Sequence, residues 1–353
     1  MNFEKIKILG IMSGTSLDGI DFVVVDFQLI NNQWYFKINE NATIPYPEEW
    51  FSRLKFAAHL SATELIDLNN NYTHFFNAQI HKFIDESQVE NLNAIASHGH
   101  TILHNPKEGY TLQIGNLPEI KSGFSIPFIC DFRVQDVQLG GQGAPLVPIG
   151  DRFLFSEFEF CLNLGGFSNI SFEQNGIRIA FDICPVNTVL NYYVNKLNLE
   201  YDDQGKIAAS GKINKNLLHS LNSNEFYSKS FPKSLGIEFV FAEVVPLIDK
   251  FNLPIEDVLA TYVEHIAIQV SNQLKNKKGK LLITGGGAFN IYLINCIIKY
   301  NSNMVIEIPN SDIINYKEAL IFAFLGVLRL NNVNNVLASV TGAKHDHSSG
   351  VIF

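Results

Sequence analysis

The chain has 353 residues, of which 46% are hydrophobic and 17% charged, with a net charge of −9 at pH 7. This balance is typical of a protein with a large buried core, and it argues against non-specific binding to nucleic acid, which needs a basic surface. Apolar runs fall short of the roughly 18–20 residues that span a bilayer, and charges at Glu4, Lys5 and Lys7 do not suit a secretory signal. The four cysteines lie far apart without a CxxC pair, so we expect reduced thiols, no zinc site and a cytoplasmic protein.

Alternating and helical patterns divide the first part of the chain into elements. Residues 6–26 read as two strands joined by a small polar loop, 13–19. Ser61 and Glu64 form the pattern of a capping box, which starts a helix whose apolar face continues to Phe83. The remaining expected elements are strands at 34–38, 94–97, 111–114 and 126–130 and a short helix at 118–123.

The same order begins again after a Gly-rich stretch at 139–146. We expect strands at 161–164, 168–172, 176–181, 281–283 and 305–308, helices at 186–197, 255–270, 291–300 and 317–330, and a polar region at 201–234. A repeated β-β-β-α-β-α order implies an α/β protein with two mixed sheets, each covered by helices. The duplicated ribonuclease-H-like fold of the actin-like ATPases has this order and holds a nucleotide in a cleft between two domains. We assign residues 1–130 and 331–353 to its first domain and 131–330 to its second.

Three Gly-rich turns fall at the ends of predicted strands, at residues 13–19, 165–166 and 285–287. Gly14 and Gly19 can take a positive φ and let a ligand approach the backbone. Successive N–H groups in such turns can bind phosphate, Asp18 could hold a hydrated Mg²⁺, and the third turn opens a helix whose N-terminus favours anions. An ordinary hairpin or strand-to-helix turn is the alternative for each, because Gly, Ser and Asp are common turn residues.

Asp182 ends a predicted strand shortly before a helix that begins near Pro185. A carboxylate in this place can act as a general base toward a water or a hydroxyl. The alternative is a helix N-cap, in which the carboxylate accepts hydrogen bonds from the first N–H groups of the helix. The sequence pattern leaves both roles open.

Two further clusters carry polar side chains without a specific signature. His98, His100 and His104 have no Cys or carboxylate partner at ligand spacing, so we expect packing and hydrogen bonding at a strand end rather than a metal site. His345 and His347 in the tail are expected to be solvated.

Arg133 could bind a carboxylate or phosphate in bidentate fashion, or form an ion pair with Asp131 or Asp136. Glu318 begins the last predicted helix, where a negative charge suits the helix dipole. It could instead face a substrate.

Ordered motifs along the chain point to one known family. Residues 10–21 read GIMSGTSLDGID and residues 140–148 read GGQGAPLVP. The other matching blocks are Ser97, His98 and Gly99 with Thr101, His104 and Pro106, residues 113–115, residues 131–133 with Asp136, residues 163–166 with Asn169, the spaced set Asp202, Gly205, Ala208 and Gly211, and residues 339–343. With these motifs the sequence resembles the anhydro-N-acetylmuramic acid kinase family over nearly the whole chain.

This resemblance implies an actin-like kinase, generally dimeric, that uses ATP with Mg²⁺. Its members add water to 1,6-anhydro-N-acetylmuramic acid and phosphorylate O6, which yields N-acetylmuramic acid 6-phosphate in cell-wall recycling. Asp18 would hold Mg²⁺, Arg133 would bind the lactyl carboxylate of the sugar and Glu318 would position the sugar. The residues implied in ATP binding are Gly14, Thr15, Ser16, Leu17, Asp18, Gly19, Ile20, Asp21, Gly165, Gly166, Gly285, Gly286 and Gly287.

The family places its catalytic base in a Phe/Tyr-Asp-Thr-Gly-Pro-Gly-Asn segment, which here reads FDICPVN at 181–187. Asp182 is therefore the implied base. Ile183, Cys184 and Val186 depart from the pattern, and the loss of two glycines can reshape the turn that presents Asp182. His100 stands where Gln is usual and Asp151 where His is common. Two alternatives stay open, a kinase of this fold for another amino sugar and a non-catalytic nucleotide-binding relative.

Overall fold

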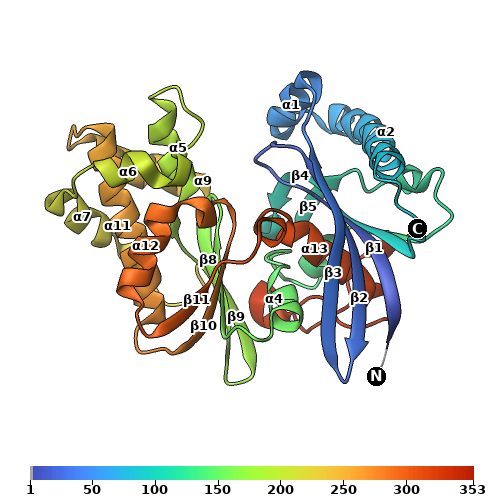
Figure 1. Cartoon of the computed structure of the whole chain (residues 1–353). Helices are drawn as coiled ribbons and strands as arrows, with labels where there is room; N and C mark the ends of the chain where they lie inside the picture. Colours follow the sequence, from blue (N-terminus) through green and yellow to red (C-terminus); the bar gives the residue numbers. More distant parts are fainter. Residues whose placement is uncertain (1–2) are drawn as a thin grey trace. The chain divides into compact units, whose positions relative to one another are not determined.

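The computed structural model describes residues 3–353. The chain separates into two compact units, which are Met1–Phe155 with Tyr316–Phe353 (unit 1) and Ser156–Asn315 (unit 2) (Figure 1). Each unit has its own sheet and its own helices. Within residues 3–353, no helix combines the length and the apolar character needed to cross a membrane.

The sheet of unit 1 has the strand order β12-β6-β4-β1-β2-β3, and β5 pairs with the second half of β4. The pairs β1·β2 and β2·β3 are antiparallel, whereas β4 is parallel to both β1 and β6. The strands are β1 (Phe3–Ser13), β2 (Ile20–Ile30), β3 (Gln33–Ile44), β4 (Ala94–Asn105), β5 (Tyr110–Ile114), β6 (Phe128–Cys130) and β12 (Val351–Ile352).

Two long helices, α2 (Ala62–Glu86) and α13 (Ser311–Leu330), pack on the two faces of this sheet. Because side chains alternate along a strand, Leu9 and Gly10 of β1 point to opposite faces. Leu9 belongs to the buried cluster that contains Tyr72 of α2. Gly10 lies so close to α13 that a Cβ there would be 2.2 Å from the Ala319 carbonyl oxygen.

The shorter helices of unit 1 join these layers. They are α1 (Glu48–Lys55), α3 (Val134–Gln138), α4 (Pro148–Leu154) and α14 (Ala338–Thr341), with 3₁₀ turns at Ala57–His59, Pro106–Glu108 and Pro118–Lys121. The expected helix at 118–123 is therefore a 3₁₀ turn.

The sheet of unit 2 has the strand order β11-β10-β7-β8-β9. Read from the antiparallel edge, the two sheets share one order, β3-β2-β1-β4-β6 in unit 1 and β9-β8-β7-β10-β11 in unit 2. This repetition confirms the duplicated ribonuclease-H-like fold. The strands are β7 (Phe160–Leu164), β8 (Phe167–Gln174), β9 (Ile177–Pro185), β10 (Gly279–Thr284) and β11 (Met304–Glu307).

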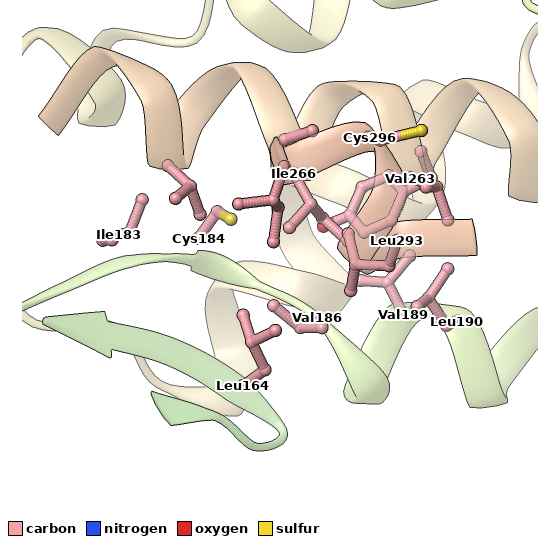
Figure 2. Packing of buried hydrophobic residues seen from close by; sticks show 14 of the residues in the cluster. Leu164, Ile183, Cys184, Val186, Val189, Leu190, Val263, Ile266, Leu293 and Cys296 are labelled. Atoms are coloured by element: carbon pink, nitrogen blue, oxygen red, sulfur yellow. The ribbon is translucent and has the colours of Figure 1, made fainter. Parts of the chain in front are cut away.

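A single apolar cluster joins the sheet of unit 2 to its helices. In Figure 2, Val263 and Ile266 of α11 and Leu293 of α12 lie above Leu164, which ends β7, and Val186, which follows β9. The helices are α5 (Asn187–Asn195), α6 (Lys206–Ser210), α7 (Lys215–Asn222), α8 (Glu225–Ser228), α9 (Ile237–Phe239), α10 (Val245–Asp249), α11 (Ile255–Leu274) and α12 (Ile291–Tyr300), with 3₁₀ turns at Asp203–Gly205 and Gly286–Phe289 and a π-helical turn at Val240–Val244.

The compact units divide the chain at other places than the domain boundaries expected after residue 130 and before residue 331. Residues 131–155 and 316–330 lie in unit 1. A Cβ on Gly150 of α4 would lie 2.4 Å from Ile321 of α13, so these two segments pack tightly on each other.

Candidate active site

The loop between β1 and β2 exposes the side chains of Thr15, Ser16 and Asp18. It closes as a tight turn, in which the Leu17 N–H donates to the Gly14 carbonyl oxygen over 3.3 Å. The left-handed residue of this turn is Leu17, with φ 63°, and not Gly14 as expected. Gly19 is needed for a different reason, because a Cβ there would lie 2.5 Å from the Ile44 carbonyl oxygen.

The residues after this loop enter the sheet. Ile20 is fully buried, so only its main chain can face a ligand. Asp21 is half-buried and accepts a hydrogen bond from Thr43 Oγ1 at 2.6 Å. Burial raises the pKa of Asp21, the Thr43 hydroxyl lowers it in part, and the charge of Asp18 raises it again. The two carboxylates therefore lie close enough to interact.

Asp18 and Asp21 can be compared with the ligands that Mg²⁺ requires. Across residues 3–353, no three His, Cys, Asp or Glu side chains form a ready metal cage. Mg²⁺ commonly takes only one or two carboxylates, with waters and substrate phosphates as its other ligands. Exposed Asp18 with neighbouring Asp21 fits a phosphate-bound Mg²⁺, and not an ion held by protein alone.

Arg133 lies within unit 1 and contacts the histidine-rich strand β4. Its Nε donates to His98 Nε2 at 2.7 Å and its Nη1 donates to the Gly143 carbonyl oxygen at 2.9 Å. His98 must therefore be neutral, with its proton on Nδ1, which lies 2.9 Å from the Gly99 carbonyl oxygen. Burial and the charge of Arg133 hold the pKa of His98 well below its usual range, which agrees with a neutral ring.

The alternative role of Arg133, an ion pair with Asp131 or Asp136, is wrong, because its N–H groups donate to His98 and Gly143 instead. Burial lowers the pKa of Arg133 to about 10, whereas the charges of Glu318 and Asp136 raise it. No residue from 3 to 353 pairs with Arg133 Nη2 in a hydrogen bond. One edge of the guanidinium can therefore receive an anion.

Glu318 lies well inside α13, which begins at Ser311, so the expected role at a helix N-terminus is wrong. Desolvation of its carboxyl by the surrounding protein raises the pKa of Glu318, although the residue as a whole is exposed. Arg133 and Lys317 lower this pKa, and Asp21 raises it. The charge couplings connect Glu318 with both Asp21 and Arg133, so one region of unit 1 contains all three.

Asp136 is fully buried and holds the Gly-rich loop at 139–143. Its Oδ2 accepts the Gly143 N–H at 2.6 Å and its Oδ1 accepts the Thr341 hydroxyl at 2.7 Å. Gly141 has no room for a side chain, because a Cβ there would lie 2.2 Å from Asp136 Oδ2. His347 is buried, with Nε2 3.6 Å from Asp136 Oδ1, so its expected solvation is wrong. His345 is exposed as expected.

The three histidines lie inside β4, because this strand continues to Asn105 instead of ending at residue 97. His100 is buried, and its Nδ1 lies 2.7 Å from Ser13 Oγ at the end of β1. Ser13 Oγ also contacts the Tyr46 hydroxyl at 2.6 Å. Burial lowers the pKa of His100 to about 4, so the ring is neutral in the folded protein.

Unit 2 brings its two Gly-rich turns together. A Cβ on Gly285, which has φ 82°, would lie 2.5 Å from Asn163 Oδ1, and a Cβ on Gly287 would lie 2.7 Å from Leu164 Cβ. The carbonyl oxygens of Gly165 and Gly166 accept the N–H groups of residues 186–188, so they cap α5. The third turn opens a 3₁₀ turn instead of α12, whose N-cap is Asn290.

Asp182 lies inside β9, and the alternative of a helix N-cap is wrong. The N-cap of α5 is Val186, without a capping side chain. Asp182 pairs with Asn169 across the sheet, and the next pair is Cys184 with Ser168, so Ile183 forms a bulge beside Asp182. Such a bulge redirects neighbouring side chains. Burial raises the pKa of Asp182, and a hydrogen bond from the Leu235 N–H lowers it in part.

The whole chain can be compared with known proteins. A sequence profile of anhydro-N-acetylmuramic acid kinase matches residues 6–353. The chain belongs to this kinase family. The family member from Haemophilus influenzae is 34% identical and aligns with 100% of this chain and 99% of its own length. That from Mannheimia succiniciproducens is 33% identical, with 98% of each chain aligned.

A solved structure of the activator of the 2-hydroxyisocaproyl-CoA dehydratase from Clostridium difficile with bound ADPNP is 14% identical to this chain. It covers 90% of this chain and 92% of its own, with a TM-score of 0.41. The fold assignment therefore rests on strand order. Membership of the kinase family agrees with the resemblance of the sequence motifs.

Proposed function

We propose that the chain is an ATP-dependent kinase that converts 1,6-anhydro-N-acetylmuramic acid, ATP and water to N-acetylmuramic acid 6-phosphate and ADP. The observation that carries this proposal is membership of the kinase family over residues 6–353. The residues of each unit support this proposal, because unit 2 has a candidate base and both units have Gly-rich turns that suit phosphate.

Asp182 is proposed as the general base. It takes a proton from the water that attacks the anomeric carbon, the bond from that carbon to O6 breaks, and O6 attacks the γ-phosphorus while ADP leaves. A raised pKa suits this role, because a base is most effective when its pKa approaches the working pH. The proton on Asp182 then returns to solvent.

The phosphates of ATP are assigned to the main-chain N–H groups of residues 14–18 and of the turns at 165–166 and 285–287. Such N–H groups stabilise the charge on a transferring phosphoryl group without changing their orientation. Asp18, with Asp21 beside it, is the proposed contact for Mg²⁺, which when bound neutralises phosphate charge. Ile20 and Asp21 complete the loop on the β2 side.

The sugar is assigned to Arg133 and Glu318. Arg133 has a free guanidinium edge that suits a carboxylate such as the lactyl group of the muramyl sugar. Glu318 is an exposed residue whose carboxyl has a raised pKa, which suits hydrogen bonds to sugar hydroxyls. The protein is further proposed to act as a cytoplasmic homodimer, which light scattering of the purified protein can test.

The deciding experiment supplies ATP, Mg²⁺ and 1,6-anhydro-N-acetylmuramic acid, follows ADP release and identifies the product by mass spectrometry. The expected product is the 6-phosphate with one added water. Asp182→Asn should lower kcat by at least about 100-fold while ATP still binds, because the base is lost and the phosphate turns remain. Normal turnover by Asp182→Asn would remove the base assignment, and ATP binding without turnover of any sugar would indicate a non-catalytic relative.

A kinase acting on another amino sugar is the second candidate. It is favoured by Cys184 and Val186, which follow Asp182 closely in sequence and are completely buried at positions where the family pattern has glycine. A panel of anhydro and free amino sugars with coupled ADP detection tests it. A higher kcat/KM for a different sugar would decide for this candidate.

A further inference from the structure

A strap formed by residues 229–236 lies against the exposed edge of the sheet in unit 2. The strand β9 is the last in the order β11-β10-β7-β8-β9, so one of its sides has no neighbouring strand among the described residues. The strap uses this side, because the Asp182 N–H donates to the Lys233 carbonyl oxygen over 3.1 Å. The polar region that interrupts the predicted pattern therefore covers the strand that contains the proposed base.

Aromatic contacts fasten the strap beside Asp182. Phe231 of the strap stacks on Phe181 of β9, with ring centroids 5.6 Å apart and an angle of 11° between the planes. Lys233 extends over the Phe226 ring, with Nζ 4.8 Å from its centroid, and donates to the Phe226 carbonyl oxygen at 3.4 Å. These contacts fix the strap to both β9 and α8.

The strap also binds the carboxylate itself. The Leu235 N–H donates to Asp182 Oδ2 at 2.8 Å. For Oδ1 of the same carboxylate, no hydrogen-bond partner occurs among residues 3–353, and it is not one of the fully buried polar atoms. One oxygen is therefore held by the main chain, and the other can take a proton.

We infer that Leu235 is a positioning residue for Asp182, because its main-chain N–H orients the carboxylate and stabilises its ionised form. This inference rests on the proposed function, since it gives Leu235 a role through the proposed base. A main-chain donor acts independently of the side chain at position 235, so no sequence motif reveals it.

The titratable groups around Asp182 do not supply this effect. Cys184 follows the bulge and is completely buried, and burial raises the pKa of its thiol to about 12, so it stays neutral. Lys233 is the nearby cation, but its Nζ is directed to Phe226. Burial raises the pKa of Asp182, and the Leu235 N–H is the group that opposes it.

Two variants at one position separate the N–H from the side chain. Leu235→Pro removes the N–H, and Leu235→Ala keeps it while removing most of the side chain. Because the lost donor stabilises the carboxylate, Leu235→Pro should move the acid limb of the pH profile of kcat/KM upward by about one pH unit, which is a tenfold loss of rate on that limb. Leu235→Ala should leave the acid limb in place.

Phe231→Ala is a second way to loosen the strap if Leu235→Pro does not fold. It removes the stacking on Phe181 and keeps the Leu235 N–H, so the loosened strap should weaken the hydrogen bond to Asp182 and move the acid limb in the same direction by a smaller amount. An unchanged acid limb in both Leu235→Pro and Phe231→Ala, with the fold verified by circular dichroism, would overturn the inference.

Hydrogen exchange of the Leu235 amide tests the contact without any turnover. Asp182→Ala removes the acceptor and should speed exchange of this amide by more than about tenfold. The Lys280 amide, which donates to Glu159 Oε2 at 2.6 Å, is the control in the same unit and should not change. If the Leu235 amide exchanges at the same rate in Asp182→Ala as in the parent protein, the positioning role is overturned. If Asp182→Ala speeds this exchange but the parent protein turns over no sugar, only the proposed function is overturned.

Discussion

Replacing His100 by Gln should make unit 1 more resistant to acid. The ring is buried, and its pKa is lowered to about 4, against about 6.5 in an unfolded chain. Because the pKa of His100 is lower in the folded protein, the unfolded chain binds the proton more tightly. Protonation of His100 therefore lowers the free energy of unfolding as the pH falls from 6.5 toward 4. At pH 5 this loss amounts to about 2 kcal/mol relative to pH 7.5.

Gln has an amide that can keep the contact with Ser13 Oγ, which is 2.7 Å from His100 Nδ1, but it does not titrate. His100→Gln is expected to be less stable at pH 7.5, because the ring contacts with Tyr46 and Tyr72 are lost. The quantity to compare is therefore the fall in the free energy of unfolding between pH 7.5 and pH 5. This fall should be about 2 kcal/mol smaller in the variant than in the parent protein.

Urea unfolding followed by tryptophan fluorescence measures the free energy of unfolding of unit 1, which contains His100. The chain has two tryptophans, Trp34 and Trp50, and both are buried in unit 1 with His100. His74→Gln, at an exposed position on α2, is the control for replacing a histidine in the same unit. If the fall from pH 7.5 to pH 5 is the same in His100→Gln as in the parent, the argument from burial is refuted.

Two further predictions concern the buried loop support and the third Gly-rich turn. Thr341→Val removes the hydroxyl bond to Asp136 and should lower the free energy of unfolding by about 1.5–3 kcal/mol by the fluorescence assay, whereas Thr341→Ser should stay near the parent. Gly285→Ala places a Cβ 2.5 Å from Asn163 Oδ1 and should weaken ATP binding by at least about tenfold in calorimetry. Gly176→Ala, with φ 75° but open space around a Cβ, shares the backbone cost without the clash and should bind ATP normally.

The order of elements could be predicted from the sequence because the sheets are built from strongly patterned segments. Ile8, Leu9 and Ile11 lie in a short apolar run that stops at the polar loop beginning with Ser13, and this run predicts a strand before any tertiary contact is known. The apolar pattern predicts a helix from residue 317, whereas α13 begins at Ser311. Asn310, whose side chain accepts the Ile313 N–H at 3.0 Å, was the available signal for this helix start.

The site could be predicted only in part, since several of its contacts join distant segments. The Leu235 N–H meets Asp182 across 53 residues of sequence. The pairing of Asp136 with Thr341 and His347 likewise depends on how the tail folds back. Residue type alone gave the candidates, whereas only the structure excluded the N-cap role for Asp182.

The discontinuity of unit 1 has a consequence for synthesis of the chain on the ribosome. Unit 2 is continuous in sequence, and residues 316–353 of unit 1 follow it. Until α13 is made, one face of the first sheet lacks the helix that packs against Gly10 and Ala96. Unit 2 is therefore expected to complete its fold first. Until α13 is synthesised, the first sheet of unit 1 keeps an exposed apolar face that chaperones can bind.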